Sequence, residues 1–191
     1  MTPLWFSTRR SRLAGYGVHV FLTRGVMIDT GFHAVRGPIS RLVDERPPRG
    51  IILTHQHEDH AGNLELVAAR GIPIAAAPMT LDAVAMRAPI GFYRRFVWSP
   101  MPVLRSPIIS FESEGLELIH TPGHSADHHV VWDADRETLF AGDLFLAVKV
   151  RVARPGEDPR RLVDSLRRAA SLHPKRVFDA HRGEIPSPVT S

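Results

Sequence analysis

Residues 51–60 read Ile-Ile-Leu-Thr-His-Gln-His-Glu-Asp-His, which places three imidazoles directly behind a short apolar run. Side chains two positions apart on an extended backbone point to the same side, so His55 and His57 can converge on one cation. If the chain turns into a helix near Ala61, Asp59 and His60 face another direction and can serve a second cation. A polar surface loop is the alternative, but the spacing of these donors favours a metal site.

The composition is that of an ordinary soluble protein. With 191 residues, 43% apolar and 23% charged, the chain is expected to form one domain over residues 1–191, with 186–191 as a loose tail. No apolar run reaches the roughly 18 residues of a membrane span, and the N-terminus lacks the apolar stretch of a secretory signal. We therefore expect a cytoplasmic protein without a membrane partner. The absence of cysteine excludes disulfides, thiolate ligands and a thiol nucleophile.

The charge balance is basic, with a net charge of +4 and a pI near 10.3. Nearly all the basic residues are arginines, and they occur in short pairs such as Arg94-Arg95 and Arg160-Arg161 instead of one tract. This distribution is compatible with a small anionic substrate and gives less support to dedicated nucleic-acid binding, which stays an alternative. The oligomeric state cannot be predicted from it.

Strand and helix patterns alternate along the chain in two groups. Residues 18–23 and 25–29 predict a hairpin turned at Arg24-Gly25. Asp158 followed by Pro159 predicts the start of an amphipathic helix. Residues 88–102 are rich in aromatics, arginine and proline and are expected to be irregular. The remaining predicted strands are 51–54, 72–75, 108–112, 116–121, 130–133, 138–141 and 176–180, and the remaining predicted helices are 63–70 and 80–87.

Three further donors follow predicted strands. His124 follows the strand that ends at Thr121, Asp143 follows 138–141, and His181 follows 176–180. The carboxyl ends of strands border the crevice in which α/β proteins bind ligands. Singly, each of these residues could be an ordinary turn former, whereas together with the first cluster they indicate a shared site.

The chain at this point resembles the metallo-β-lactamase-fold superfamily of hydrolases. The matching pieces run in the family's order and cover nearly the whole sequence. The resemblance implies an α/β fold, a four-layer αβ/βα sandwich of two mixed β-sheets with helices on the outer faces. The matching pieces are Asp29-Thr30-Gly31, His55-x-His57-x-Asp59-His60, Thr121-Pro122-Gly123-His124, Ala141-Gly142-Asp143 and His181.

The resemblance also implies a ligand assignment for two zinc ions, with manganese or iron as possible replacements. His55, His57 and His124 would bind the first ion. Asp59, His60 and His181 would bind the second ion, and Asp143 would bridge both. Asp29 would hold a ligand's second ring N–H, and His120 and His128 would support the site from beside the motif.

The implied reaction is attack on a small ester, thioester or lactone by a hydroxide that bridges the two metals, with Asp59 and Asp143 as catalytic residues. Chelation is then expected to abolish activity and to lower the melting temperature. The lack of cysteine argues against β-lactamases that use a thiolate ligand, and the chain length leaves no room for the extensions of larger relatives. A phosphodiesterase or ribonuclease of the same fold, and a sulfur dioxygenase with a single iron, are the alternatives.

Substrate contacts are expected from segments that border the metals. Residues 88–102, with their aromatic side chains, could form a lid, or could be an ordinary packed connection. Tyr93 within this segment, Lys149 and Arg182 are the predicted substrate-binding residues.

Overall fold

The computed structural model describes residues 1–86, 89–145 and 156–185. The chain divides into two compact units, Met1–Ser113 and Glu114–Ser191, which we call unit 1 and unit 2. That both units form a single domain stays a prediction, and the predicted tail, 186–191, lies outside the described residues.

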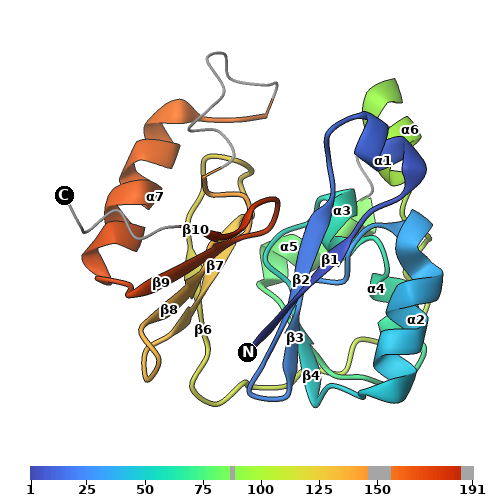
Figure 1. The fold of residues 1–191 in the computed structure, drawn as a ribbon, viewed down its shortest axis with the longest axis horizontal. Helices are drawn as coiled ribbons and strands as arrows, with labels where there is room; N and C mark the ends of the chain where they lie inside the picture. The colour runs from blue at the N-terminus through green and yellow to red at the C-terminus, as the bar shows by residue number, and fades with distance from the viewer. Residues whose placement is uncertain (87–88, 146–155, 186–191) are drawn as a thin grey trace. The chain divides into compact units, whose positions relative to one another are not determined.

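Unit 1 is built around a five-stranded mixed sheet of strand order β1-β2-β3-β4-β5 (Figure 1). The first three strands are antiparallel neighbours, whereas β3, β4 and β5 run parallel. All of β4 is buried, which explains why its sequence is continuously apolar instead of alternating. The strands are β1 (Thr2–Phe6), β2 (Val18–Thr23), β3 (Val26–Ile28), β4 (Gly50–Ile52) and β5 (Ile74–Ala75).

The helices of unit 1 follow or connect these strands. The longest, α2 (Arg36–Glu45), buries Ile39 and Val43 and links β3 to the parallel strand β4. None of the helices in the described ranges has the length and apolar character that a bilayer crossing requires. The other elements are α1 (Arg9–Leu13), the 3-10 helix η1 (His33–Val35), α3 (Glu58–Ala61), α4 (Leu64–Ala68), α5 (Pro78–Met86) and α6 (Phe92–Trp98).

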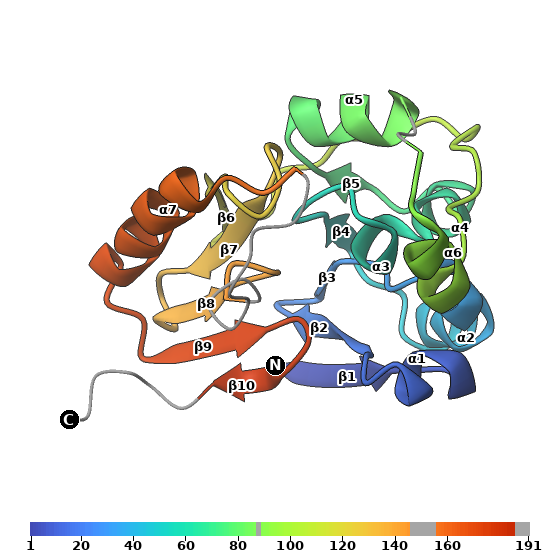
Figure 2. The ribbon, with the colours of Figure 1, turned by 90° about the horizontal axis from the view of Figure 1, so that it is seen from above.

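Unit 2 contains a second five-stranded mixed sheet, of order β10-β9-β8-β7-β6, with α7 (Pro159–Ser171) alongside it (Figure 2). Asp158 caps α7 by accepting hydrogen bonds from the backbone N–H groups of Arg160 and Arg161. Leu162 and Ala169 of this helix pack into the core of the unit against the sheet. The strands are β6 (Glu117–His120), β7 (His129–Asp133), β8 (Thr138–Phe140), β9 (Arg176–Asp179) and β10 (Gly183–Ile185).

Most predicted elements are confirmed, with ends that agree to within two residues. The predicted strand 108–112 is wrong: this segment is irregular, and Ile109 only accepts a bond from the Ile74 N–H at 2.7 Å. The irregular conformation expected for 88–102 is also wrong in part, because α6 forms within it. Elements β1, α1, α2 and β10 were not predicted.

Gly123 occupies a position at which a side chain cannot be accommodated. Its φ is +140°, and an added Cβ would lie 2.5 Å from the Cα and N of Leu162, which belong to the backbone of α7. The Gly123 carbonyl also accepts a bond from the Asp158 N–H at 2.7 Å. The turn that carries His124 is thus packed directly against the start of α7.

Gly123→Ala is therefore expected to reduce the free energy of unfolding by about 1–3 kcal/mol, because a helix backbone must move. Gly37→Ala is the matched control, since a Cβ at this α2 position meets nothing within 4 Å. Urea denaturation measures both variants, and equal midpoints for Gly123→Ala and the parent protein would contradict the close contact.

Candidate metal centre

The donors of unit 1 lie in the loop after β4 and in the first turns of α3. The strand ends at Ile52, His57 precedes the helix in an extended conformation, and Glu58–Ala61 form α3. The helix therefore begins before the predicted Ala61, and Asp59 and His60 are helical. His55, Asp59 and His60 are buried.

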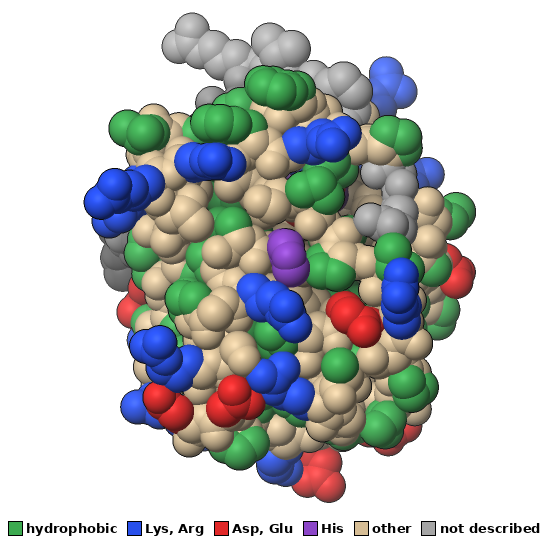
Figure 3. Space-filling model, turned by 90° about the vertical axis from the view of Figure 1, so that its right-hand side faces the viewer, with side chains coloured by type: hydrophobic (Ala, Val, Ile, Leu, Met, Phe, Trp, Pro, Cys, Tyr) green, Lys and Arg blue, Asp and Glu red, His purple; other side chains and the backbone are tan. Residues whose placement is uncertain are grey.

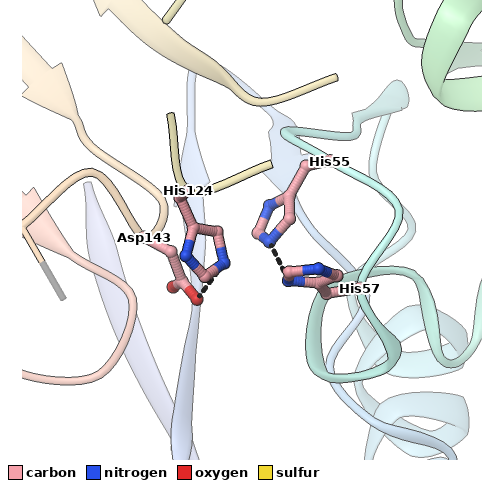
Figure 4. A group of neighbouring side chains, drawn as sticks. All are labelled: His55, His57, His124 and Asp143. Carbon is pink, nitrogen blue, oxygen red and sulfur yellow. Dashed lines mark hydrogen bonds and ion pairs between the residues drawn. The ribbon is translucent and has the colours of Figure 1, made fainter. Parts of the chain in front are cut away.

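His55 and His57 face each other, as Figure 4 shows. His55 Nε2 lies 3.0 Å from His57 Nδ1. Nitrogens bonded at about 2.0–2.1 Å to one tetrahedral zinc are about 3–3.5 Å apart, so the pair has the separation of two ligands of one ion. The other ring nitrogen of His55 lies 3.1 Å from Thr54 Oγ1, and this contact orients the ring.

The Asp29 carboxylate contacts Thr54 and His60, the two ends of the 54–60 segment. Its Oδ1 accepts a bond from the Thr54 N–H at 2.8 Å, and its Oδ2 lies 2.7 Å from His60 Nδ1. A neutral His60 therefore carries its proton on Nδ1, and the lone pair of its Nε2 is available to a cation. His60 Nε2 lies 3.9 Å from Asp59 Oδ2. Asp29 thus contacts the Nδ1 side of His60, a predicted ligand, and its supporting role stays a prediction.

Glu58 was not predicted to have a role, although it lies between two predicted ligands. Its carboxylate is buried and lies 2.5 Å from Arg94 Nη2 of α6. Burial raises the pKa of Glu58, and the Arg94 charge opposes this effect. The ion pair connects α3, which carries Asp59 and His60, to α6.

In unit 2, the carboxylate of Asp143 lies between two imidazoles. Its Oδ2 is 3.2 Å from His124 Nε2, and its Oδ1 is 3.2 Å from His181 Nε2. Asp143 is buried, and its contact with His124 is drawn in Figure 4. One carboxylate that offers a separate oxygen beside each of two imidazoles has the arrangement of a bridging ligand.

His128 supports Asp143 through the backbone. Its Nε2 accepts a bond from the Asp143 N–H at 3.1 Å, and its Nδ1 lies 3.1 Å from the Thr121 carbonyl oxygen. These two bonds define a neutral ring with the proton on Nδ1. His128 thus ties the turn that carries Asp143 to the end of β6.

Asp179 shapes the turn that carries His181, and sequence reasoning missed it. Its Oδ1 accepts bonds from the backbone N–H groups of His181 at 2.8 Å and Arg182 at 3.0 Å. Burial raises the pKa of Asp179, and the nearby Asp143 charge adds to the effect. An Asp two residues before a candidate ligand is a common turn signal and could have been noticed.

The remaining predicted residues have fewer contacts with the donors. His120 Nε2 lies 2.9 Å from the Ala126 carbonyl oxygen, and the Tyr93 ring packs edge-on against Tyr16. Arg182 is exposed, and Lys149 lies outside the described residues. Their supporting or substrate-binding roles stay predictions.

Two further unpredicted residues contact donors. Thr54 Oγ1 contacts His55, and Glu157 Oε1 lies 3.5 Å from His124 Nδ1.

The donor sets fit divalent transition metals. Unit 1 offers three imidazoles and the Asp59 carboxylate, and unit 2 offers two imidazoles and the Asp143 carboxylate. Neutral imidazoles with carboxylates and no thiolate suit zinc, iron or manganese. A buried carboxylate such as Asp143 is costly among neutral groups, and a cation would offset that cost.

Mixed sheets with histidine and carboxylate donors after their strands define a metal-binding α/β protein. The chain belongs to the metallo-beta-lactamase superfamily, whose family model matches residues 20–181. This match contains both donor sets and confirms the resemblance expected from the sequence motifs.

Curated relatives are similar over most of the chain. A beta-lactamase-like protein 2 homolog of Drosophila melanogaster is 28% identical over 180 residues, which cover 87% of this chain and 58% of the relative. A lactamase-like protein nscB of Trichophyton verrucosum is 30% identical over 71% of this chain and 42% of the relative. The chain thus spans about half the length of these relatives.

Solved structures confirm the fold class. TTHA1623 in a di-iron-bound form is 26% identical with a TM-score of 0.70, over 97% of this chain and 94% of that chain. A metallo-beta-lactamase from Pontibacter korlensis is 18% identical with a TM-score of 0.65, over 95% of this chain and 86% of that chain. The two mixed five-stranded sheets with helices are those of the metallo-β-lactamase fold.

Proposed function

We propose that this protein is a dinuclear metal-dependent hydrolase of small esters, thioesters or lactones. The observation that carries the proposal is the placement of Asp143, with one carboxylate oxygen beside His124 and the other beside His181. Such a residue is suited to bridge two ions, and a site with a single metal does not need it.

The proposed site joins the donors of both units. His55, His57 and His124 would bind the first ion, and Asp59, His60 and His181 the second, with Asp143 shared. Membership of the superfamily over residues 20–181, which include all seven donors, supports this grouping. TTHA1623, a similar protein, was solved in a di-iron-bound form, which supports the binding of two ions. Iron is therefore a candidate metal as well as zinc.

Two dications bound there would polarise a carbonyl oxygen and make water acidic enough to react near neutral pH. The protein's own contribution is orientation. Asp29 fixes the His60 ring, Thr54 fixes the His55 ring, and His128 fixes the backbone of Asp143. The buried Asp59 carboxylate would accept a hydrogen bond from the attacking water and hold it toward the substrate.

Metal analysis and a substrate panel test the proposal together. We expect two metal ions per chain and hydrolysis of at least one p-nitrophenyl ester, thioester or lactone. Removal of the ions by a chelator should abolish turnover, and added zinc should restore it. Because the folded state binds the ions more tightly than the unfolded state, their loss should also remove up to about 4 kcal/mol of stability per ion at a metal concentration about 1,000-fold above Kd.

The alternatives give different results in the same experiment. Activity on bis-p-nitrophenyl phosphate alone would favour the phosphodiesterase or ribonuclease. One iron per chain with oxygen-dependent oxidation of a sulfur substrate would favour the dioxygenase. Full turnover after metal loss verified by elemental analysis would contradict all three metal-dependent mechanisms.

A further inference from the structure

Unit 1 contains a cavity of about 330 Å³ directly beside the metal-donor loop. Gln56 and Glu58 line one side of it, and these two residues alternate in sequence with His55, His57 and Asp59. The volume lies at the lower end of the range for small-molecule sites. The cavity can therefore accept a short group attached to a substrate whose reacting atom lies at the donors.

The opposite wall combines apolar side chains with one cation. Ile90, Pro100 and Met101 provide the apolar surface, and Arg95 of α6 provides the charge. An alkyl stem and an anionic end would each find a matching surface here.

The charge of Arg95 is not neutralised by the other charged residue of the cavity. Glu58 is already paired with Arg94 at 2.5 Å. Among the described residues, no carboxylate forms an ion pair with Arg95, and no acidic residue occurs between Asp82 and Glu112 in the sequence. The cavity lining therefore offers one guanidinium, that of Arg95, which no carboxylate of the described residues neutralises.

The surface around α1 and α6 has the same character. In the upper part of Figure 3, basic and apolar side chains lie together, whereas the acidic side chains of this view lie in its middle and lower parts. Arg95 of α6 is exposed, so an anionic ligand can reach its guanidinium from solvent.

We propose that this cavity binds the non-reacting end of the substrate, and that this end is a short aliphatic chain that carries an anionic group. The Arg95 guanidinium would pair with the anion, the Gln56 amide would donate a further hydrogen bond, and the stem would lie against Ile90 and Met101. This inference rests on the proposed function, because it names the substrate class of the same site. Arg95 then determines specificity without touching the reacting atoms.

The kinetic test compares two thioesters that differ in one charge, the glutaryl and valeryl thioesters of N-acetylcysteamine. Because Arg95 is exposed and pairs between exposed charges are weak, kcat/KM should favour the glutaryl thioester by about 2- to 5-fold. Arg95→Gln should abolish this preference by lowering kcat/KM of the glutaryl thioester to that of the valeryl thioester. Arg41→Gln, at an exposed position of α2, is the matched control and should keep the preference.

A binding measurement separates this inference from the proposed function. Calorimetry with the chelator-treated protein uses glutarate and butyl phosphate as anions and butyramide as the neutral control. Binding of either anion by the parent protein and Arg41→Gln, lost in Arg95→Gln, supports the cavity, and the preferred anion distinguishes a carboxylate from a phosphate group. If no ester, thioester or lactone of the substrate panel is hydrolysed but this binding is found, the proposed function fails and the cavity stands. If both are hydrolysed equally by all variants and no anion binds, the cavity proposal is overturned and the hydrolase stands.

Discussion

Asp143→Asn is expected to lower turnover by more than about 100-fold and to reduce the bound metal below two ions per chain. Asparagine has nearly the same shape, so the contacts with His124 and His181 can persist, but the negative charge is lost. Replacing residues that merely orient a ligand costs about 10–100-fold in metal affinity or activity, and loss of a shared ligand should exceed this. Metal analysis after dialysis and single-turnover kinetics measure the two effects.

The control for this variant is Asp164→Asn. Asp164 lies on the exposed side of α7, where its side chain is 77% accessible and pairs with Arg167 at 3.3 Å. Both variants remove one negative charge from unit 2, so a general charge effect would appear in each. Two tightly bound ions and parental turnover in Asp143→Asn would show that Asp143 does not bridge.

The donors were predictable because their signals are local. His55, His57, Asp59 and His60 fall within six positions, and His124, Asp143 and His181 each follow a strand pattern. The structure places two of these strands, β8 and β9, side by side and parallel. Their carboxyl ends therefore meet, and this brings Asp143 and His181 together.

The residues that hold the donors were harder to predict because their partners are distant in sequence. Thr54 meets Asp29 across 25 positions, and Glu58 meets Arg94 across an even longer separation. Nothing in the local sequence around Thr54 or Glu58 indicates which distant residue each of them contacts. Asp179 was also missed, although its bonds lie within the turn that it begins and the local sequence could have indicated them.

The errors in secondary structure also have physical causes. The apolar pattern of 108–112 suits a strand, but Ile109 accepts only one bond from the edge strand β5 and no ladder forms. Helix α2 was missed because Gly37 and Pro38 at its start are usual turn residues, although proline is well tolerated in the first turn of a helix. In both places tertiary contacts outweigh local propensity.

Asp29 combines two unusual features, a left-handed backbone conformation and a buried carboxylate with several hydrogen bonds. It has a φ of +62°, a conformation that asparagine and aspartate tolerate better than other residues with a Cβ. Its buried carboxylate also accepts bonds from the Thr54 N–H, the Thr54 hydroxyl at 2.9 Å and His60 Nδ1. The backbone conformation and the hydrogen bonds can be separated by the choice of substitution.

Asp29→Asn keeps the tolerated backbone conformation and replaces one acceptor oxygen by an NH₂ donor. At least one of the buried donors then lacks an acceptor, which costs about 1–3 kcal/mol. Because the His60 ring is no longer fixed, metal affinity should also fall by about 10- to 100-fold. Urea denaturation of the chelated protein isolates the first effect, and competition with a chromophoric chelator measures the second.

Asp29→Ala should lower the free energy of unfolding by a further ~1–2 kcal/mol, because alanine tolerates the left-handed backbone less well. Asp82→Asn, at an exposed position of α5, is the control and should change neither quantity. If Asp29→Asn unfolded at the parental midpoint and bound metal with parental affinity, Asp29 would not be the residue that orients His60.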